Sequence, residues 1–271
     1  MTSTVPTITI GVVQVHAISL ADLLQAYDQM IGQREQGYTC FCEAHLCVRA
    51  ARDPRVRGVL EGARYVLPDG VATTWGARML GEKFPERLSG PSVMLELCRH
   101  GLDKGYRHFF YGGAAGVPDR LAERLKERFP GLNVVGTYSP PFRELSPEED
   151  AELVELINCA RPDIVWVGLG APKQEVWANE HVNKLAAPLL LPVGAAFDFH
   201  SGTRKWAPRW IRTLGMEWVY RMCTGGRRVF IRNATNESLF TGMILRQAIR
   251  KRISIIGKGI HKDANHNSHP G

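Results

Sequence analysis

The chain has 271 residues, of which 44% are hydrophobic and 23% charged, as in a soluble protein with one large α/β domain and an appendage, or two small domains. No run approaches the roughly 18 apolar residues that span a bilayer, and the strand-like start lacks the basic n-region of a signal peptide. We therefore expect a cytoplasmic protein whose six cysteines are reduced; without paired C-x-x-C motifs, their spacing disfavours a structural zinc site.

The net charge of +7 is unevenly distributed along the chain. From Thr203 to Lys262 there are 14 Lys and Arg residues against two acidic residues, so this segment carries +12 and the remainder −5. An acidic body with a basic end indicates that the end meets a polyanion, either phospholipid head groups or nucleic acid.

Short apolar runs alternate with amphipathic helical stretches up to about residue 195. Ser19 is expected to begin one helix, and Ser146 with Glu149 forms a capping box before another. Runs such as DIVWVGLG and PLLLPVG are typical of parallel strands covered on both faces. The pattern predicts a Rossmann-like, doubly wound, mainly parallel sheet, with strands at residues 8–15, 38–42, 65–67, 108–111, 133–136, 164–167 and 189–193.

The sequence changes character after Gly202, where it becomes basic and aromatic. We divide the chain into a Rossmann-like domain at 1–202, a basic helical appendage at 203–262 and a disordered tail at 263–271. Trp75, Trp166 and Trp177 lie in the first part and are expected in its core.

Ligands of such sheets bind beyond the carboxyl ends of the strands, and three strand-to-helix turns carry polar or glycine residues there. In the first turn, LPDG, Asp69 is placed to act as a base. Pro-Asp-Gly is also a common turn in which Asp69 would cap the following helix, and the local sequence favours this simpler interpretation.

The second turn, YGGAAG, brings Gly112 and Gly113 to the start of a helix, where glycines let a backbone approach a phosphate. It does not match G-x-G-x-x-G, and no acidic residue follows at the ribose-binding distance, so binding of NAD is weakly supported. A phosphate contact and a tight packing turn both remain open.

The third turn, GLGAPKQE, lacks the G-K-[ST] of an ATP-type phosphate loop. Gly170 and Pro172 suit a sharp turn, and Lys173 falls in the first turn of the helix. A cation is unfavourable at a helix N-terminus unless it meets an anion, so Lys173 favours a functional role for this turn.

An ordered set of motifs extends over about residues 10–232, namely LPDG…W-x-AR-x-LG, FFYGG-x-x-GV, VGTYSPPF, VGLGAPKQE-x-W, VGAAFDFHSG and APRW…LG-x-EW-x-YR. In their order and spacing these motifs resemble the WecG/TagA/CpsF family, glycosyltransferase family 26. The resemblance implies an inverting, UDP-sugar-dependent transfer to a polyprenyl-diphosphate-linked glycan during surface polysaccharide synthesis. The donor would be of the N-acetylmannosamine, N-acetylmannosaminuronic acid or glucose type. GTYSPPF is similar to an exopolysaccharide branch of the family.

The resemblance also implies roles for residues, position by position. Asp69 matches the general base, and Gln174 matches a residue near the reacting diphosphate. Asp198 matches a group near the uracil, on which Tyr138 or Phe142 would stack. With these, the expected UDP-sugar site comprises Gly112, Gly113, Tyr138, Phe142, Gly170, Lys173 and Asp198, and the acceptor diphosphate would meet Arg221, Arg228 and Arg232.

Several positions depart from the family pattern. Cys42 and Glu43 stand where Thr-Asn is common, Ser92 replaces a frequent Asp, and Ile231 stands where an Arg is usual. These departures bear on the identity of the acceptor more than on the class of donor.

Inversion requires one in-line displacement, in which Asp69 takes the proton of the acceptor hydroxyl while UDP leaves. Turn amides, a helix N-terminus and arginines of the appendage can stabilise the departing charge. With those donors, and without an Asp-x-Asp motif, we predict no metal and no cofactor. The expected location is the inner face of the cytoplasmic membrane, bound peripherally, and a homo-oligomer remains open.

Two alternatives come from other classes of protein. The basic end, with its interleaved aromatic residues, could bind nucleic acid beside a catalytically silent body. An NAD-dependent oxidoreductase is disfavoured by the missing fingerprint.

Overall fold

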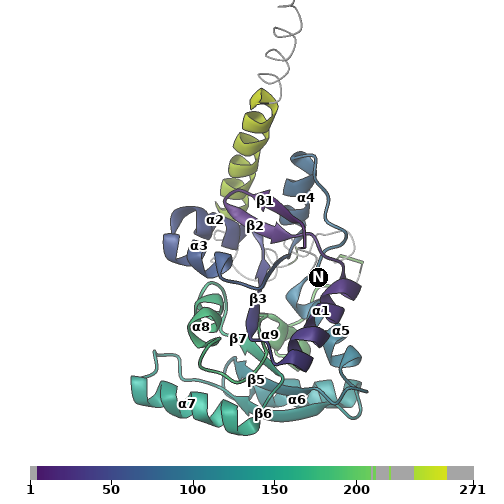
Figure 1. Ribbon diagram of the computed structural model, residues 1–271, viewed down its shortest axis with the longest axis vertical. Coiled ribbons are helices and arrows are strands. Elements are labelled where there is room, and N and C mark those ends of the chain that lie inside the picture. The colour runs from purple at the N-terminus through teal and green to yellow at the C-terminus, as the bar shows by residue number, and fades with distance from the viewer. Residues whose placement is uncertain (1–4, 209, 212–219, 221–234, 255–271) are drawn as a thin grey trace, which may run out of the picture.

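The computed structural model describes residues 5–208, 210–211, 220 and 235–254. Its centre is a six-stranded sheet in which every neighbouring pair is parallel, in the order β4-β3-β8-β7-β5-β6 (Figure 1). The strands are β3 (Gly37–Cys42), β4 (Tyr65–Pro68), β5 (Arg107–Gly112), β6 (Asn133–Tyr138), β7 (Ile164–Gly168) and β8 (Leu189–Pro192).

Helices cover both faces of this sheet. One core unites α1 (Leu20–Gln33), α5 (Gly90–His100), α6 (Val117–Arg128) and α9 (Ala196–Ser201) with one face of the strands. The other core unites α2 (Ala44–Arg52), α3 (Pro54–Glu61), α7 (Pro147–Ala160) and α8 (Lys173–His181) with the opposite face.

Neighbouring strand residues divide between the two cores, as Phe109 and Phe110 do on β5. This alternation follows from the two-residue period of a strand. It confirms the predicted doubly wound parallel sheet.

The first predicted strand is wrong in one respect. Residues 8–15 do not form one strand of the sheet but an antiparallel hairpin, β1 (Thr7–Ile10) and β2 (Val13–His16), in which Ile10 pairs with Val13. The tight turn between them depends on Gly11, whose φ is 65°, a conformation that glycine adopts at little cost. An alternating apolar pattern indicates which residues of a strand face the core, but it does not indicate where the chain reverses direction.

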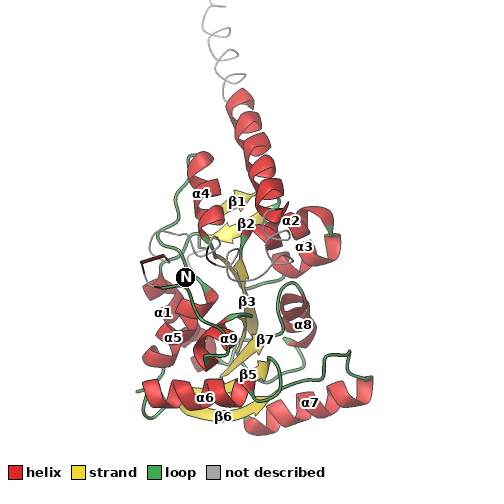
Figure 2. Cartoon of the chain, turned by 180° about the vertical axis from the view of Figure 1, so that it is seen from behind, coloured by secondary structure: helices red, strands yellow, loops and turns green. Residues whose placement is uncertain are grey.

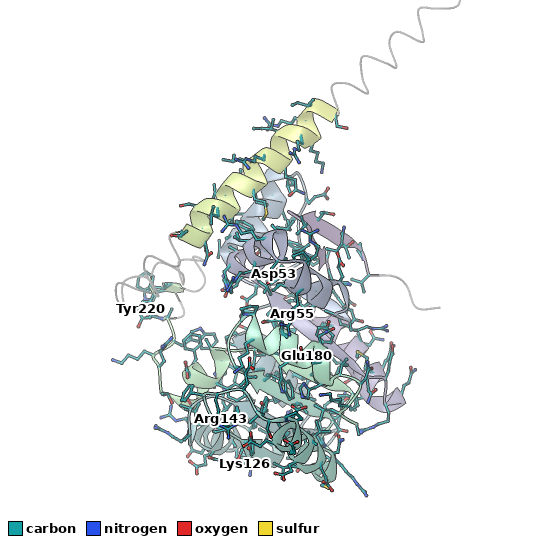
Figure 3. The ribbon with its side chains drawn as sticks, turned by 90° about the vertical axis from the view of Figure 1, so that its left-hand side faces the viewer. Asp53, Arg55, Lys126, Arg143, Glu180 and Tyr220 are labelled. Atoms are coloured by element: carbon teal, nitrogen blue, oxygen red, sulfur yellow. The ribbon has the colours of Figure 1, made fainter. Side chains whose placement is uncertain are left out.

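The predicted helix starts are confirmed. The hydroxyl of Ser19 accepts a hydrogen bond from the amide of Asp22, and Ser146 and Glu149 make both bonds of a capping box. Among the tryptophans expected in the core, Trp166 and Trp177 are buried, but Trp75, on α4 (Val71–Met79), is 62% exposed. Figure 3 shows Arg55 on α3 beside Glu180 on α8, an ion pair of 2.8 Å that joins the two helices.

A helix over residues 235–254 packs on the hairpin and α4 and extends beyond the body (Figure 2). Phe240 and Ile244 are buried at this contact. The side chain of Gln247 accepts from the amide of Gly11 and donates to the carbonyl of Thr9, both at 2.8 Å. The predicted appendage therefore contains a helix. Among the described residues, no helix is both long and apolar enough to cross a membrane.

Candidate functional site

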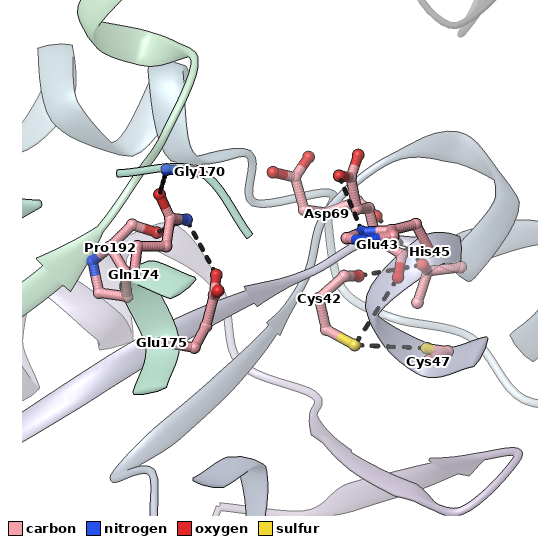
Figure 4. A network of polar contacts seen from close by, with 10 residues as sticks. Cys42, Glu43, His45, Cys47, Asp69, Gly170, Gln174, Glu175 and Pro192 are labelled. Carbon is pink, nitrogen blue, oxygen red and sulfur yellow. Dashed lines mark hydrogen bonds and ion pairs between the residues drawn. The ribbon is translucent and has the colours of Figure 1, made fainter. Parts of the chain in front are cut away.

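The parallel sheet brings the three turns identified in the sequence to one edge, because all six strands end on the same side. Asp69 follows β4, Gly113 follows β5 and the segment 169–175 follows β7. Figure 4 shows the central part of this edge, with Asp69 and Glu43 on one side and Gln174 and Glu175 on the other.

Asp69 is not the N-cap residue of the helix that follows it. The N-cap of α4 is Gly70, with φ 78° and no side-chain capping bond, so the simpler interpretation of the LPDG turn is wrong in this respect. Oδ2 of Asp69 instead accepts from the amide of Gly90, the first residue of α5, at 3.3 Å. The positive end of that helix therefore faces the carboxylate. The hydroxyl of Thr73 holds the turn by donating to the carbonyls of Cys42 and Asp69, at 3.0 and 3.1 Å.

Two of the unusual residues, Cys42 and Glu43, lie directly beside this turn. A Cβ placed on Gly70 would be 3.8 Å from the Cβ of Glu43, and Oε1 of Glu43 lies 3.7 Å from Nδ1 of His45. Cys42 is fully buried, with its sulfur 3.3 Å from that of Cys47. The hydrogen bond between these thiols, together with burial, raises the pKa of Cys42. Its thiol is thus engaged inside the protein rather than offered to a ligand.

Close packing explains the two glycines of the second turn. Gly112 has φ 122°, and a Cβ there would lie 2.7 Å from the backbone of Gly168 on β7. The amide of Gly113 donates to the carbonyl of Gly168 at 2.9 Å, and a Cβ on Gly113 would come within 3.0 Å of Val117. Of the two interpretations left open, the packing turn is therefore present in the structure. A phosphate contact stays a prediction.

The third turn is held together by the amide of Gln174. Its oxygen accepts from the backbone of Gly170 at 3.0 Å, and its nitrogen donates to Oε1 of Glu175 at 2.9 Å and to the carbonyl of Pro192 at 3.0 Å. Both amide hydrogens are thus used within the protein, and Gln174 is buried. Its position joins the turn after β7 to the end of β8, while Lys173 beside it is exposed.

Glu175 is the residue of this site that the sequence interpretation did not single out. Its side chain is buried, and the pKa rises to about 7 because burial outweighs the hydrogen bonds from Gln174 and the backbone. The signal in the sequence was weak, because an acidic residue in the first turn of a helix is ordinarily explained by the helix dipole.

The residues expected around the uracil lie further along the same edge. Tyr138 ends β6, with its ring stacked 6.2 Å from that of Tyr111. Phe142 lies in the loop that follows and is 95% exposed. Asp198 lies in α9, where its carbonyl accepts from the amide of Arg204 at 3.0 Å. Of the two rings proposed to stack on a base, Phe142 is the one left uncovered.

The three arginines expected at the acceptor diphosphate, Arg221, Arg228 and Arg232, lie outside the described residues. Within the described part of the chain, no group of three or more His, Cys, Asp or Glu side chains is arranged to hold a metal ion.

Comparison with known proteins gives a consistent result. Residues 8–254 match the family described as Glycosyl transferase WecG/TagA/CpsF family. The chain is 29% identical over 198 residues to an N-acetylglucosaminyldiphosphoundecaprenol N-acetyl-beta-D-mannosaminyltransferase of Bacillus spizizenii, covering 73% of this chain and 75% of that protein. It is 30% identical over 174 residues to a protein of the same name from Bacillus subtilis strain 168, covering 64% of this chain and 66% of that protein.

Proposed function

Because the chain belongs to the WecG/TagA/CpsF family of glycosyltransferases, we propose that it transfers N-acetylmannosamine from a UDP donor to N-acetylglucosaminyl-diphosphoundecaprenol. The names of the two Bacillus relatives support this acceptor. They also favour N-acetylmannosamine over the other two donor types considered, N-acetylmannosaminuronic acid and glucose. Membership of the family favours glycosyl transfer over the two alternatives from the sequence analysis, an NAD-dependent oxidoreductase and a nucleic-acid-binding protein.

The observation that carries the proposal is the position of Asp69. Its carboxylate lies at the shared strand edge, oriented by the amide of Gly90 and facing the turn that contains Gln174 across the site (Figure 4). In the proposed reaction, an acceptor hydroxyl attacks the anomeric carbon as UDP leaves from the opposite side, with inversion. Asp69 takes the hydroxyl proton, which is the help a positioned base gives in the transition state.

The leaving diphosphate is proposed to lie near the start of α8. The N-terminus of a helix favours an anion, and Lys173 adds an exposed cation there. Gln174 keeps the turn in shape through its three hydrogen bonds. Asp198 and Phe142 would contact the uridine, and Arg221, Arg228 and Arg232 the acceptor diphosphate. We propose no metal in this scheme.

We further propose that the protein binds an anionic membrane surface through the helix at 235–254. Ile249 and Ile253 each follow a buried residue, Phe240 and Ile244, by nine positions, about two and a half turns, and so lie on the opposite face. With Leu245 they form an apolar stripe that is 46–64% exposed and is flanked by Arg246, Arg250 and Arg252. An apolar stripe bordered by cations is typical of helices that lie in the membrane interface.

Mass spectrometry of reaction products tests the proposed activity. The purified protein would be incubated with N-acetylglucosaminyl-diphosphoundecaprenol and a panel of UDP-sugars. We expect one added N-acetylhexosamine with UDP-N-acetylmannosamine and little product with UDP-glucose. Efficient transfer from another donor would overturn the proposed sugar, and no transfer from any UDP-sugar would overturn the proposed donor class.

A further inference from the structure

Glu175 lies at the end of a short chain of hydrogen bonds that begins at the third turn. The amide of Gly170 donates to the oxygen of Gln174, and the nitrogen of Gln174 donates to Oε1 of Glu175. Any anion bound at the start of α8 would therefore be close to this carboxyl group, with only the amide of Gln174 and its neighbours between them.

The second oxygen of Glu175 has no hydrogen-bond partner, although the side chain is only 1% exposed. An ionised carboxylate in this position costs free energy that the hydrogen bonds from Gln174 and the backbone do not offset. The carboxyl group is thus poised between its neutral and charged forms near neutral pH, with a pKa of about 7.

The groups that face Glu175 come from three elements. Glu43, at the start of α2, raises the pKa of Glu175, whereas His45 in the same helix lowers it. Cys40 and Cys42, on β3, are buried, and the charge of Glu175 contributes to raising their own pKa values. Gln174, from α8, donates to the carboxylate. The cysteines stay neutral near pH 7, so Glu43 and His45 are the titratable neighbours that act on the charge of Glu175 among the described residues.

We infer that Glu175 binds a proton when the anionic donor occupies the site and releases it when the donor leaves, which couples the affinity for donor to pH. The inference rests on the proposed position of the donor diphosphate. A second negative charge near a buried carboxylate disfavours the ionised form, so donor and proton bind cooperatively, and each must raise the affinity for the other by the same factor. The proton comes from the buffer, and no bond other than O–H changes.

Calorimetry of UDP-N-acetylmannosamine binding tests this coupling. Its diphosphate joins two esters and so does not itself titrate near neutral pH. Titrations at pH 7 in phosphate and in Tris, which differ in ionisation enthalpy, give the number of protons taken up. We expect about half a proton per site, and a Kd that rises about fivefold to tenfold between pH 6 and pH 8. Glu175→Gln keeps the acceptor for Gln174 but cannot titrate, so uptake should vanish and the Kd should become independent of pH.

The matched control is Glu180→Gln, which removes an exposed carboxylate from the same helix and should retain the wild-type uptake. Equal uptake by Glu175→Gln and wild type would overturn the inference and assign the proton to another group, with His45 the first to examine. Donor binding by wild type without proton uptake would overturn it while leaving the proposed function intact. Failure of wild type to bind the donor would overturn both.

A second measurement does not depend on the variant. In wild-type protein labelled with 13C at glutamate carboxyl carbons, one resonance should titrate near pH 7. Its midpoint should move upward by at least about one pH unit when UDP-N-acetylmannosamine is bound. An unmoved midpoint would overturn the inference, even if Glu175→Gln failed to fold.

Discussion

Asp69 and Glu175 are carboxyl groups at the same strand edge, in opposite surroundings. Asp69 accepts from a helix amide at 3.3 Å, an arrangement that favours the negative charge of a base. Glu175 is buried with one oxygen unpartnered, an arrangement that disfavours charge. Different surroundings of this kind let protein sites assign different roles to similar side chains.

Asp69→Asn should lower turnover at least about a hundredfold while donor affinity changes little. The amide oxygen can still accept from Gly90, so the turn should persist, but the base is lost. Turnover with N-acetylglucosaminyl-diphosphoundecaprenol and calorimetry with UDP would be measured, with the melting temperature as a check on folding. Turnover within a few-fold of wild type would show that Asp69 only shapes the turn.

Gly112→Ala should destabilise the fold by at least about 1–3 kcal/mol, the range for a residue forced into a disfavoured backbone conformation. The new methyl would also meet the backbone of Gly168 at 2.7 Å. Gly58 provides the control, because it is exposed within α3 with nothing within 4 Å of an added Cβ. Gly58→Ala should stabilise by about 0.4–1 kcal/mol. Urea denaturation measures both, and equal stabilities would refute the packing argument.

At the scale of elements, the loop after β6 is the least enclosed part of the proposed donor site. It carries Phe142, whose ring is almost fully exposed, on a segment with two consecutive prolines, Pro140 and Pro141. An exposed aromatic ring contributes little to folding, because it removes little apolar surface from water. A role in binding would therefore be separable from stability.

Phe142→Ala should weaken binding of UDP about fivefold to a hundredfold, as expected when a stacked base loses about 1–3 kcal/mol. The melting temperature should stay within a degree or two of wild type, because the ring is uncovered. Calorimetry with UDP gives the affinity, and Tyr138→Ala separates the two candidate rings. An unchanged UDP affinity for Phe142→Ala would remove this ring from the site.

At the scale of the whole molecule, exposed apolar side chains lie beside Arg246, Arg250 and Arg252 at one end. The helix at 235–254, the hairpin and α4 lie at the end opposite α7 (Figures 1 and 2), and exposed Trp75 and Met79 on α4 add to the apolar surface there. Cations near an anionic bilayer each contribute about 1 kcal/mol, screened beyond about 8 Å at physiological salt. Membrane binding at this end should combine apolar insertion with salt-sensitive attraction.

Leu245→Asp combined with Ile249→Asp should reduce binding to vesicles of phosphatidylglycerol and phosphatidylcholine at least about tenfold, since charge enters the exposed stripe. Wild-type binding should weaken as salt rises from 50 to about 500 mM. Leu156→Asp, a comparably exposed leucine on α7, should leave binding unchanged. Equal losses in both variants, or stronger binding to DNA than to vesicles, would contradict membrane docking.

The class of fold could be inferred from the sequence because its signals are local. Apolar runs of strand length, helical periodicity and the caps at Ser19 and Ser146 each depend on neighbours within a few residues, and the structure confirms them. The hairpin at the N-terminus was missed because the apolar pattern continues through the turn. The chain reverses there through the backbone conformation of a single residue, Gly11.

By itself, the sequence determined the doubly wound sheet, the family and the turns in which chemistry is expected. Only the tertiary structure decided which groups share a desolvated space. Asp69 meets Gly90 because α5 returns to the end of β4. Glu175, which follows β7, is close to Glu43 and His45, which follow β3, because a single strand, β8, lies between β7 and β3. The charge state of a buried group depends on neighbours that are distant along the chain, and the strand order that brings them together leaves no local signature in the sequence.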